Sequence, residues 1–213
     1  MTHEIKTIKE LKELINNREY VDNLTIKTDK NINHQLCYLT NLTRLKFFDT
    51  YIQLTDLSTL LNLQYLEFGS YYNQLTDLSL LSNLQHLKFG YDYDQSTDLS
   101  QLSNLQYLKF GGYYNQKTDL STLSNLQHLE FGSDYNQLTD LSMLSNLQHL
   151  QFGNNYNIQT DLSNLINLTY LKFSFKYGYP TDLTNCKKLK TLNYKDIEEL
   201  DLSVHCNGIF KKN

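Results

Sequence analysis

The sequence contains no tryptophan, one proline and eight glycines among its 213 residues. With so few chain breakers, no stretch is rich enough in proline or glycine to act as a flexible linker, which predicts one continuous domain. Long apolar runs are also absent, since none approaches the roughly 20 residues that a helix needs to span a bilayer. The opening MTHEIKTIKE lacks the apolar centre of a signal peptide, so we expect neither export nor contact with a membrane.

The sequence also lacks a large net charge of either sign and an even number of cysteines. The net charge of −4 does not suggest a general nucleic-acid binder, and we expect no nucleic-acid partner. The three cysteines are an odd number without the spacing of a metal site. We interpret Cys37, Cys186 and Cys206 as reduced thiols of a cytoplasmic protein.

What the sequence has in abundance is repetition. Each unit opens with a leucine that recurs every 21 residues, without insertion or deletion, at Leu42, Leu63, Leu84, Leu105, Leu126, Leu147, Leu168 and Leu189. One further unit fits upstream, beginning at Val21. A period this strict indicates that every unit follows the same path and packs against its neighbours.

Within a unit, apolar residues occupy positions 1, 4, 6, 16 and 19, counted from the opening leucine. In LQYLEFGSYYNQLTDLSLLSN, Leu66 and Phe68 are two residues apart, which is the alternation of a strand. Leu78 and Leu81 are three apart, which is the spacing of a helical turn, and Asp77 before them can accept a backbone N–H of that turn. A strand, a bend, a turn and a return within 21 residues make one coil of a solenoid.

The sequence therefore predicts a mainly β (or α/β) solenoid, a right-handed superhelix with a parallel sheet on its concave face and short 3₁₀ turns on its convex face. Strands are expected at residues 42–47, 63–68, 84–89, 105–110, 126–131, 147–152 and 168–173. The single domain divides into an N-terminal cap (1–20), repeats (21–194) and a C-terminal cap (195–213), because the apolar end of a solenoid needs a cover. Helical spacing from Ile5 to Ile15, with Thr7 and Glu10 as a capping box, predicts the cap helix at residues 3–17.

The pattern L-x-x-L-x-F, which recurs in register over about residues 20–195, resembles the leucine-rich repeat. The segment TDLSxLSNL looks like the internalin type of that repeat. FGSYYNQ at residues 68–74 is similar to the FNIP repeat signature, F-G-x-x-F/Y-N-Q, although the FNIP proline after Asn-Gln is absent. FNIP repeats are associated with amoebae and the giant viruses that infect them, which implies a location in the host cytoplasm if the protein is viral.

Strand positions 2, 3 and 5 are expected to point away from the core, onto the concave face. Their rows of tyrosine, histidine and glutamine resemble an antibody paratope more than an active site. The candidate partner-binding residues are Tyr65, His86, Tyr107, His128, His149, Tyr170, Lys88 and Lys109. Because basic residues outnumber acidic ones by six to two in these positions, we expect a non-enzymatic, monomeric module that binds a protein with an acidic surface. The alternative is a carbohydrate or small molecule bound by the tyrosine and glutamine rows or by a tyrosine rim.

The other polar columns have structural interpretations. The aspartates before each turn, Asp56, Asp77, Asp98, Asp119, Asp140, Asp161 and Asp182, are expected to cap the turns rather than bind calcium. The tyrosine at the tenth position of each unit is expected to be a packed ring with its hydroxyl at the coil edge, or else a rim that contacts ligand; Tyr72, Tyr93, Tyr114 and Tyr135 belong to this column. The asparagine before each opening leucine is expected to form a ladder that satisfies backbone groups.

Catalytic and metal-binding patterns are not apparent. The sequence has neither a glycine-rich phosphate loop nor a nucleophile elbow, so we expect no catalytic residue and no cofactor. His128 and His149 are predicted to lie on adjacent strands. Because the pattern fixes no carboxylate or cysteine beside them except Glu130, solvated surface histidines are favoured over a metal site.

Overall fold

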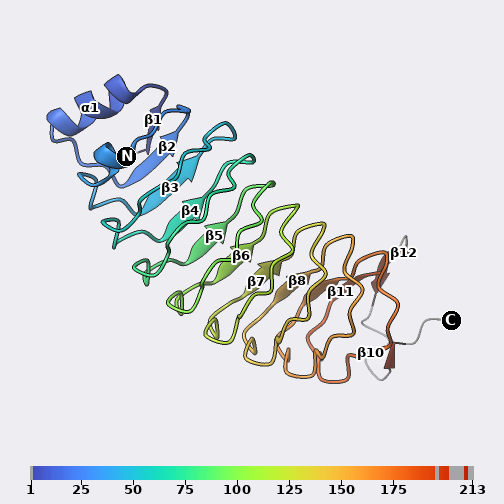
Figure 1. The fold of residues 1–213 in the computed structure, drawn as a ribbon. Helices are drawn as coiled ribbons and strands as arrows, with labels where there is room; N and C mark the ends of the chain where they lie inside the picture. Colours follow the sequence, from blue (N-terminus) through green and yellow to red (C-terminus); the bar gives the residue numbers. More distant parts are fainter. Residues whose placement is uncertain (1, 195–196, 202–208, 211–213) are drawn as a thin grey trace.

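The computed structural model is an elongated solenoid whose coils follow one another from the N-terminus to the C-terminus (Figure 1). It describes residues 2–194, 197–201 and 209–210, with side chains described for residues 3–193. The expected C-terminal cap, residues 195–213, therefore falls largely outside the described residues. No helix of the described chain is both long and apolar enough to cross a bilayer.

Within the described residues, one sheet of eleven strands runs the length of the solenoid in sequence order. Its strands are β1 (Thr2–Ile5), β2 (Asn23–Ile26), β3 (Arg44–Phe47), β4 (Tyr65–Glu67), β5 (His86–Lys88), β6 (Tyr107–Lys109), β7 (His128–Glu130), β8 (His149–Gln151), β9 (Tyr170–Lys172), β11 (Thr191–Tyr194) and β12 (Ile197–Asp201). All pair in parallel except β12, which is antiparallel to β11. A separate antiparallel pair joins β10 (Thr181–Asp182) to β13 (Ile209–Phe210).

The register follows the sequence period, so each strand residue lies opposite the residue 21 positions later, as Leu45 does with Leu66. The predicted strands are confirmed, although most hydrogen-bonded segments cover only three of the six expected residues. The turn segments agree with the predicted short 3₁₀ turns, since each is a single turn whose backbone N–H donates to the carbonyl three residues earlier. In one coil Leu81 N donates to Leu78 O at 3.0 Å, and Leu84 N donates to Leu81 O at 2.9 Å.

The N-terminal helix is shorter than predicted. Helix α1 spans Ile8–Asn16 and is opened by the predicted capping box of Thr7 and Glu10, but the residues before it form strand β1. The expectation of a helix from residue 3 was wrong because Ile5, which fits the helical spacing, is buried as a strand residue instead. Strand β1 provides hydrogen-bond partners for the outer edge of β2, which a helix there would leave without them. A second helix, α2 (Asn33–Leu36), is a single turn.

The core is built of columns of identical side chains. Phenylalanines at the strand ends stack from coil to coil at centroid distances of 5.7–6.0 Å. Tyrosines at the tenth position stack beside them at 6.1–6.4 Å, and their rings are at most 1% exposed. Each hydroxyl meets the threonine four residues later, as Tyr114 does with Thr118 Oγ1 at 2.5 Å. The packed ring is confirmed, but the hydroxyl lies inside the coil, so these tyrosines cannot form a ligand-contacting rim.

The predicted polar ladders are present. Each aspartate of the turn column accepts the backbone N–H two residues later, as Asp77 Oδ1 does from Ser79 at 2.9 Å. Each asparagine before an opening leucine from Asn62 to Asn167 donates to a carbonyl of the preceding coil, as Asn83 Nδ2 does to Leu61 O at 2.9 Å. A third ladder runs through the Asn-Gln motif, where Asn115 Oδ1 accepts the backbone N–H of Asn136 at 2.9 Å. Together these bonds satisfy backbone groups that the short coils leave without a strand or helix partner.

The spacing between coils increases with distance from the solvent side of the sheet. Rings on that side, at strand position 3, are only 4.0–4.4 Å apart, whereas the buried phenylalanines and tyrosines are 5.7–6.4 Å apart. Since each pair joins equivalent side chains of neighbouring coils, the coils fan out away from the sheet. The sheet therefore occupies the inner, concave side of the solenoid, as predicted.

Candidate functional site

The most regular feature of the concave face is one continuous stack of side chains at strand position 3, which we call the ring stack. It contains Arg44, Tyr65, His86, Tyr107, His128, His149 and Tyr170, one from each of strands β3 to β9. The Arg44 guanidinium carbon lies 3.9 Å from the Tyr65 centroid, and the following centroids are 4.2, 4.0, 4.4, 4.0 and 4.1 Å apart. The parallel register produces this stack, because it places equivalent residues side by side.

The rings of the stack present their edges, not their faces, to solvent. Neighbouring planes are inclined by only 2–15°, so each internal ring is covered on both sides. At the C-terminal end Asn193 Nδ2 donates to the Tyr170 hydroxyl at 2.9 Å. The rings are half-buried as a result, and what remains accessible is a line of phenol and imidazole edges with their polar atoms.

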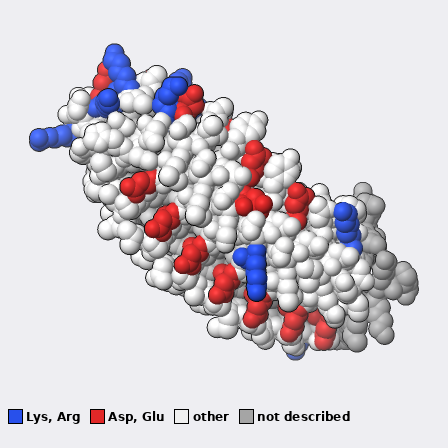
Figure 2. All heavy atoms as spheres, in the orientation of Figure 1, with Lys and Arg blue, Asp and Glu red and all other residues white. Residues whose placement is uncertain are grey.

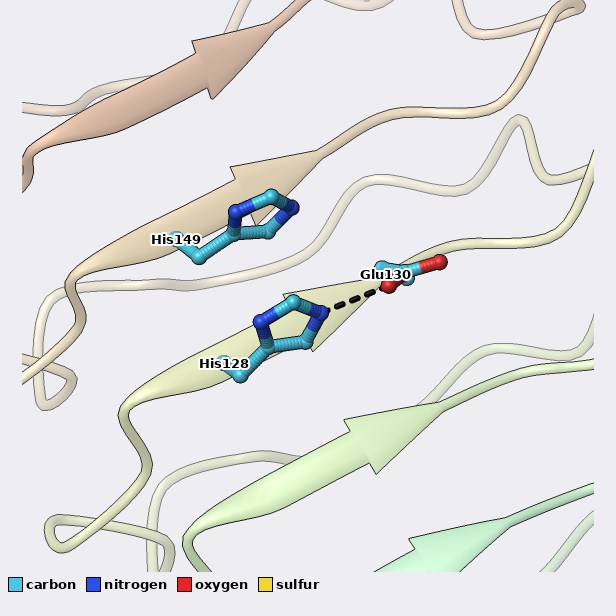
Figure 3. A group of neighbouring side chains, drawn as sticks. All are labelled: His128, Glu130 and His149. Atoms are coloured by element: carbon cyan, nitrogen blue, oxygen red, sulfur yellow. Dashed lines mark hydrogen bonds and ion pairs between the residues drawn. The ribbon is translucent and has the colours of Figure 1, made fainter.

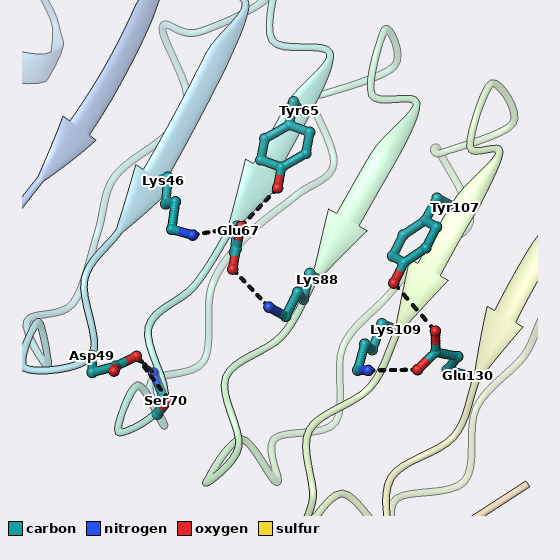
Figure 4. A network of polar contacts seen from close by, with 9 residues as sticks. All are labelled: Lys46, Asp49, Tyr65, Glu67, Ser70, Lys88, Tyr107, Lys109 and Glu130. Carbon is teal, nitrogen blue, oxygen red and sulfur yellow. Dashed lines mark hydrogen bonds and ion pairs between the residues drawn. The ribbon is translucent and has the colours of Figure 1, made fainter. Parts of the chain in front are cut away.

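A carboxylate at strand position 5 organises the N-terminal half of this face (Figure 4). Glu67 Oε1 lies 2.7 Å from Lys88 Nζ, while Oε2 lies 3.2 Å from Lys46 Nζ and accepts the Tyr65 hydroxyl at 2.7 Å. Burial opposes ionisation of Glu67, but the hydrogen bonds from Lys88 and Tyr65 outweigh it and lower its pKa to about 2. The carboxylate therefore stays charged and holds the ammonium groups of two lysines, whose side chains are 38–46% exposed, in fixed positions.

A second carboxylate, Glu130, has a related but different set of partners. Its Oε2 lies 2.5 Å from Lys109 Nζ, and its Oε1 lies 2.6 Å from His128 Nε2 and 3.4 Å from the Tyr107 hydroxyl (Figures 3 and 4). The hydrogen bond with His128 is the main cause that lowers the pKa of Glu130 to about 2, against the opposing effect of burial. His149 of the next coil lies parallel to His128, and no hydrogen bond to either of its ring nitrogens is found among the described residues.

Burial within the stack also shifts its titrating rings. Desolvation lowers the pKa of His86 to about 4 and that of His149 to about 4, so both imidazoles are neutral near pH 7. Desolvation first, and then the neighbouring carboxylates, raise the pKa of Tyr65 and of Tyr107 to about 12. These four rings are therefore uncharged near pH 7. The charged groups beside them are the guanidinium of Arg44 at the end of the stack and the lysine and glutamate side chains at strand position 5.

Two grooves flank the ring stack. One, of about 420 Å³, lies at the carboxyl ends of the strands and is lined by Lys46, Lys88, Lys109 and Tyr91 among others. The other, of about 520 Å³, is walled by two rows of primary amides from Gln85, Gln106, Gln127, Gln148, Asn104, Asn125, Asn146 and Asn167. Elsewhere, acidic side chains recur along the length of the solenoid (Figure 2).

The eight residues that the sequence predicted as partner-binding all lie on the concave face. Six of them form the ring stack with Arg44, while Lys88 and Lys109 are ion-paired with Glu67 and Glu130. Sequence reasoning missed Arg44 as the end of the stack and the two glutamates as its anchors. The available signal was the juxtaposition of opposite charges 21 residues apart in one column, as in Lys46, Glu67 and Lys88.

Comparisons with known proteins identify the fold. No protein-family model matches the chain, and no curated protein matches it. Solved structures that are similar include three internalins of Listeria monocytogenes. The functional domain of InlJ, which includes a cysteine ladder, is 21% identical over 84% of this chain and 46% of that chain, with a TM-score of 0.53. InlF is 23% identical over 90% of this chain and 58% of that one, with a TM-score of 0.63.

The third, InlC2, is 28% identical over 76% of this chain and 74% of that one, with a TM-score of 0.57. The chain spans about half the length of the first two proteins. Since the likeness covers most of this chain and reproduces its parallel coils, the fold is a solenoid of the leucine-rich-repeat type, as the sequence motifs predicted.

Proposed function

We propose that the chain is a non-enzymatic protein-interaction module that binds a protein partner across the ring stack. The observation that carries the proposal is the uninterrupted stack from Arg44 to Tyr170, which offers aromatic edges and polar atoms over seven strands. Aromatic and arginine side chains often dominate the energy of protein interfaces. A monomeric state, a cytoplasmic location and membership of the FNIP type are part of the same proposal.

Pre-organisation supports binding at this surface. Binding to a flexible surface costs side-chain entropy, roughly 0.5–1.5 kcal/mol for each ordered side chain. Here each internal ring is already held between two others, and Glu67 holds Lys46 and Lys88 before any partner arrives. A partner would therefore meet side chains that have little further freedom to lose.

The charge of the surface supports a partner with acidic patches. Positions 3 and 5 of strands β3–β9 carry five cations (Arg44, Lys46, Lys88, Lys109 and Lys172) and two anions (Glu67 and Glu130), an excess of three positive charges. Lys172 has no ion pair within the described part of the chain. A positive excess on one face of a chain whose net charge is −4 favours encounter through that face and raises the association rate.

The rival function, carbohydrate or small-molecule binding, has one observation in its favour. The exposed glutamines of the amide-lined groove, Gln85 to Gln148, make no side-chain hydrogen bond within the described residues and could bind hydroxyl groups. The ring stack, however, argues against sugar stacking, because the faces of its internal rings are already covered. A sugar would have to bind through the amides without an aromatic platform.

Photo-crosslinking tests the proposal. A benzophenone amino acid at position 106, next to Tyr107 on the concave face, should capture a partner from lysate, whereas the same group at position 117, an exposed position outside the sheet, should not. With the captured protein purified, surface plasmon resonance should show Tyr107→Ala weakening binding by about 2 kcal/mol, mainly through faster dissociation. Lys172→Gln should slow association at low salt, and Lys117→Gln is its matched control.

Other outcomes of these experiments would contradict the proposal. Capture at position 117 alone, or unchanged kinetics for Tyr107→Ala and Lys172→Gln, would move the binding site away from the ring stack. Binding to a glycan array that is lost in Gln106→Ala or Gln127→Ala, without protein capture, would favour the carbohydrate function instead.

A further inference from the structure

Three potential metal ligands converge on the concave face between β7 and β8. His128 and Glu130 are two residues apart on one strand, and His149 is the partner of His128 on the next (Figure 3). One nitrogen from each histidine and one oxygen from the carboxylate all lie within 4.8 Å of one another. All three side chains are half-buried, and His128 and Glu130 already contact each other at 2.6 Å.

Glu67, the other carboxylate on the concave face, can be compared directly with Glu130. At Glu67 the position-3 residue of the same strand is Tyr65, whose phenol donates a hydrogen bond, and lysines on both neighbouring strands occupy both carboxylate oxygens. At Glu130 the tyrosine is replaced by His128, and the lysine expected on the following strand is replaced by Gln151. Only one lysine, Lys109, then remains on this carboxylate, and the other oxygen points toward an imidazole.

We propose that His128, Glu130 and His149 form a binding site for a first-row transition-metal ion of the zinc type. Two imidazoles and one carboxylate are a common ligand set for such ions, and they leave a fourth position open. The cluster is at the surface, so the open position faces solvent. This inference is independent of the proposed protein-binding function.

The geometry of the three ligands also limits how tightly the site can bind a metal ion. A ligand nitrogen directs its lone pair in the plane of its ring, but the two imidazoles are stacked at 4.0 Å with planes only 10° apart. Both can address one ion at a Zn–N distance of about 2.0–2.1 Å only after the rings turn toward each other, which gives up their stacking. The ammonium of Lys109 at 2.5 Å from Glu130 further opposes a cation. We therefore expect weaker binding than at a closed structural zinc site.

Gln151 provides the sharpest test. It occupies on β8 the place that Glu130 occupies on β7, opposite it in the register. Gln151→Glu would add a second carboxylate beside the three ligands without changing the backbone. If the cluster is a metal site, this variant should bind zinc roughly tenfold more tightly, and His149→Ala should bind at least about tenfold more weakly.

The experiment is isothermal titration calorimetry of the full chain with zinc chloride, repeated with cobalt(II), whose visible spectrum reports the coordination geometry. Cys37 and Cys206 are replaced by serine throughout, so that their thiols do not compete for the metal. His34→Ala, which removes an exposed histidine on α2, outside the sheet, is the matched control and should leave the affinity unchanged. The melting temperature of each variant without metal confirms that it is folded.

The proposal predicts one saturable ion per chain, with the stated order of affinities. It is overturned if the parent chain, which carries only the two serine replacements, shows no saturable zinc binding, or if His149→Ala binds zinc as tightly as that parent chain. Loss of binding in His34→Ala would also overturn it, because the ion would then be bound at the exposed histidine of α2. Failure in any of these ways leaves the crosslinking test of the protein-binding function unaffected.

Discussion

Replacing Gly111 by alanine should destabilise the solenoid far more than the same change at Gly178. A Cβ atom built on Gly111 would lie 2.0 Å from the carbonyl oxygen of Gly90 in the preceding coil, whereas one on Gly178 would have no neighbour closer than 3.7 Å. Neither residue has a positive φ, so the difference lies in space and not in backbone torsion. The obstacle at Gly111 is backbone, which cannot rotate away as a side chain would.

The magnitude follows from the required displacement. Real Cβ contacts are essentially never shorter than 3.0 Å, so the two coils must separate locally by at least about 1 Å. That movement would lengthen the inter-coil hydrogen bond from Tyr113 N to Tyr91 O from 3.0 Å to about 4 Å and break it, at a cost of about 1 kcal/mol. Overpacking adds about 1–3 kcal/mol. The lower entropy of the unfolded alanine chain returns roughly 0.4–1 kcal/mol, which leaves a net loss of about 1–4 kcal/mol.

Urea unfolding followed by circular dichroism measures this difference. Gly178→Ala should be within about 0.5 kcal/mol of the wild type, or slightly more stable, for the entropic reason alone. Equal unfolding midpoints for Gly111→Ala and Gly178→Ala, with unchanged slopes, would refute the argument that glycine is needed here for close approach of neighbouring coils.

Other substitutions test the core, the capping residues and the concave face. Leu108→Ala should cost about 2–5 kcal/mol in urea unfolding because it leaves a cavity in a central coil, whereas Asp119→Ala, which removes one capping hydrogen bond, should cost only about 0.5–2 kcal/mol. The pKa of Glu67 is lowered from 4.5 to about 2, so its contribution to stability is present above pH 4.5 and lost as the pH falls toward 2; Glu67→Gln should flatten the urea stability profile in that window. The pKa of His86 is lowered from 6.5 to about 4, so the folded state resists protonation and stability falls as the pH drops from 6.5 to 4; His86→Gln should reduce that slope, and an unchanged slope would contradict burial as its cause.

The sequence by itself determined the architecture. A 21-residue period without insertions requires identical coils, and identical coils can pack only with equivalent residues side by side, which sets the parallel register of Leu45 with Leu66. Alternation of Leu66 and Phe68 with polar residues determined which side of the sheet is buried. The roles of Asp77 and Asn83 could also be predicted, because turn capping and backbone ladders depend on local geometry that the repeat fixes.

Only the tertiary structure shows how the columns of equivalent residues interact with one another and with solvent. The sequence shows tyrosine and histidine at position 3, but whether their faces are open or covered depends on the 4.0–4.4 Å spacing that coil curvature produces. It shows a tyrosine at the tenth position, but not that Tyr114 would lie wholly inside the coil with its hydroxyl bonded to Thr118. Likewise, a count of lysines indicates a basic face without showing that Glu67 and Glu130 hold three of them. Periodicity determines which residues are neighbours, whereas curvature, side-chain rotamers and burial determine the distances at which they interact, and those are properties of the stacked coils together.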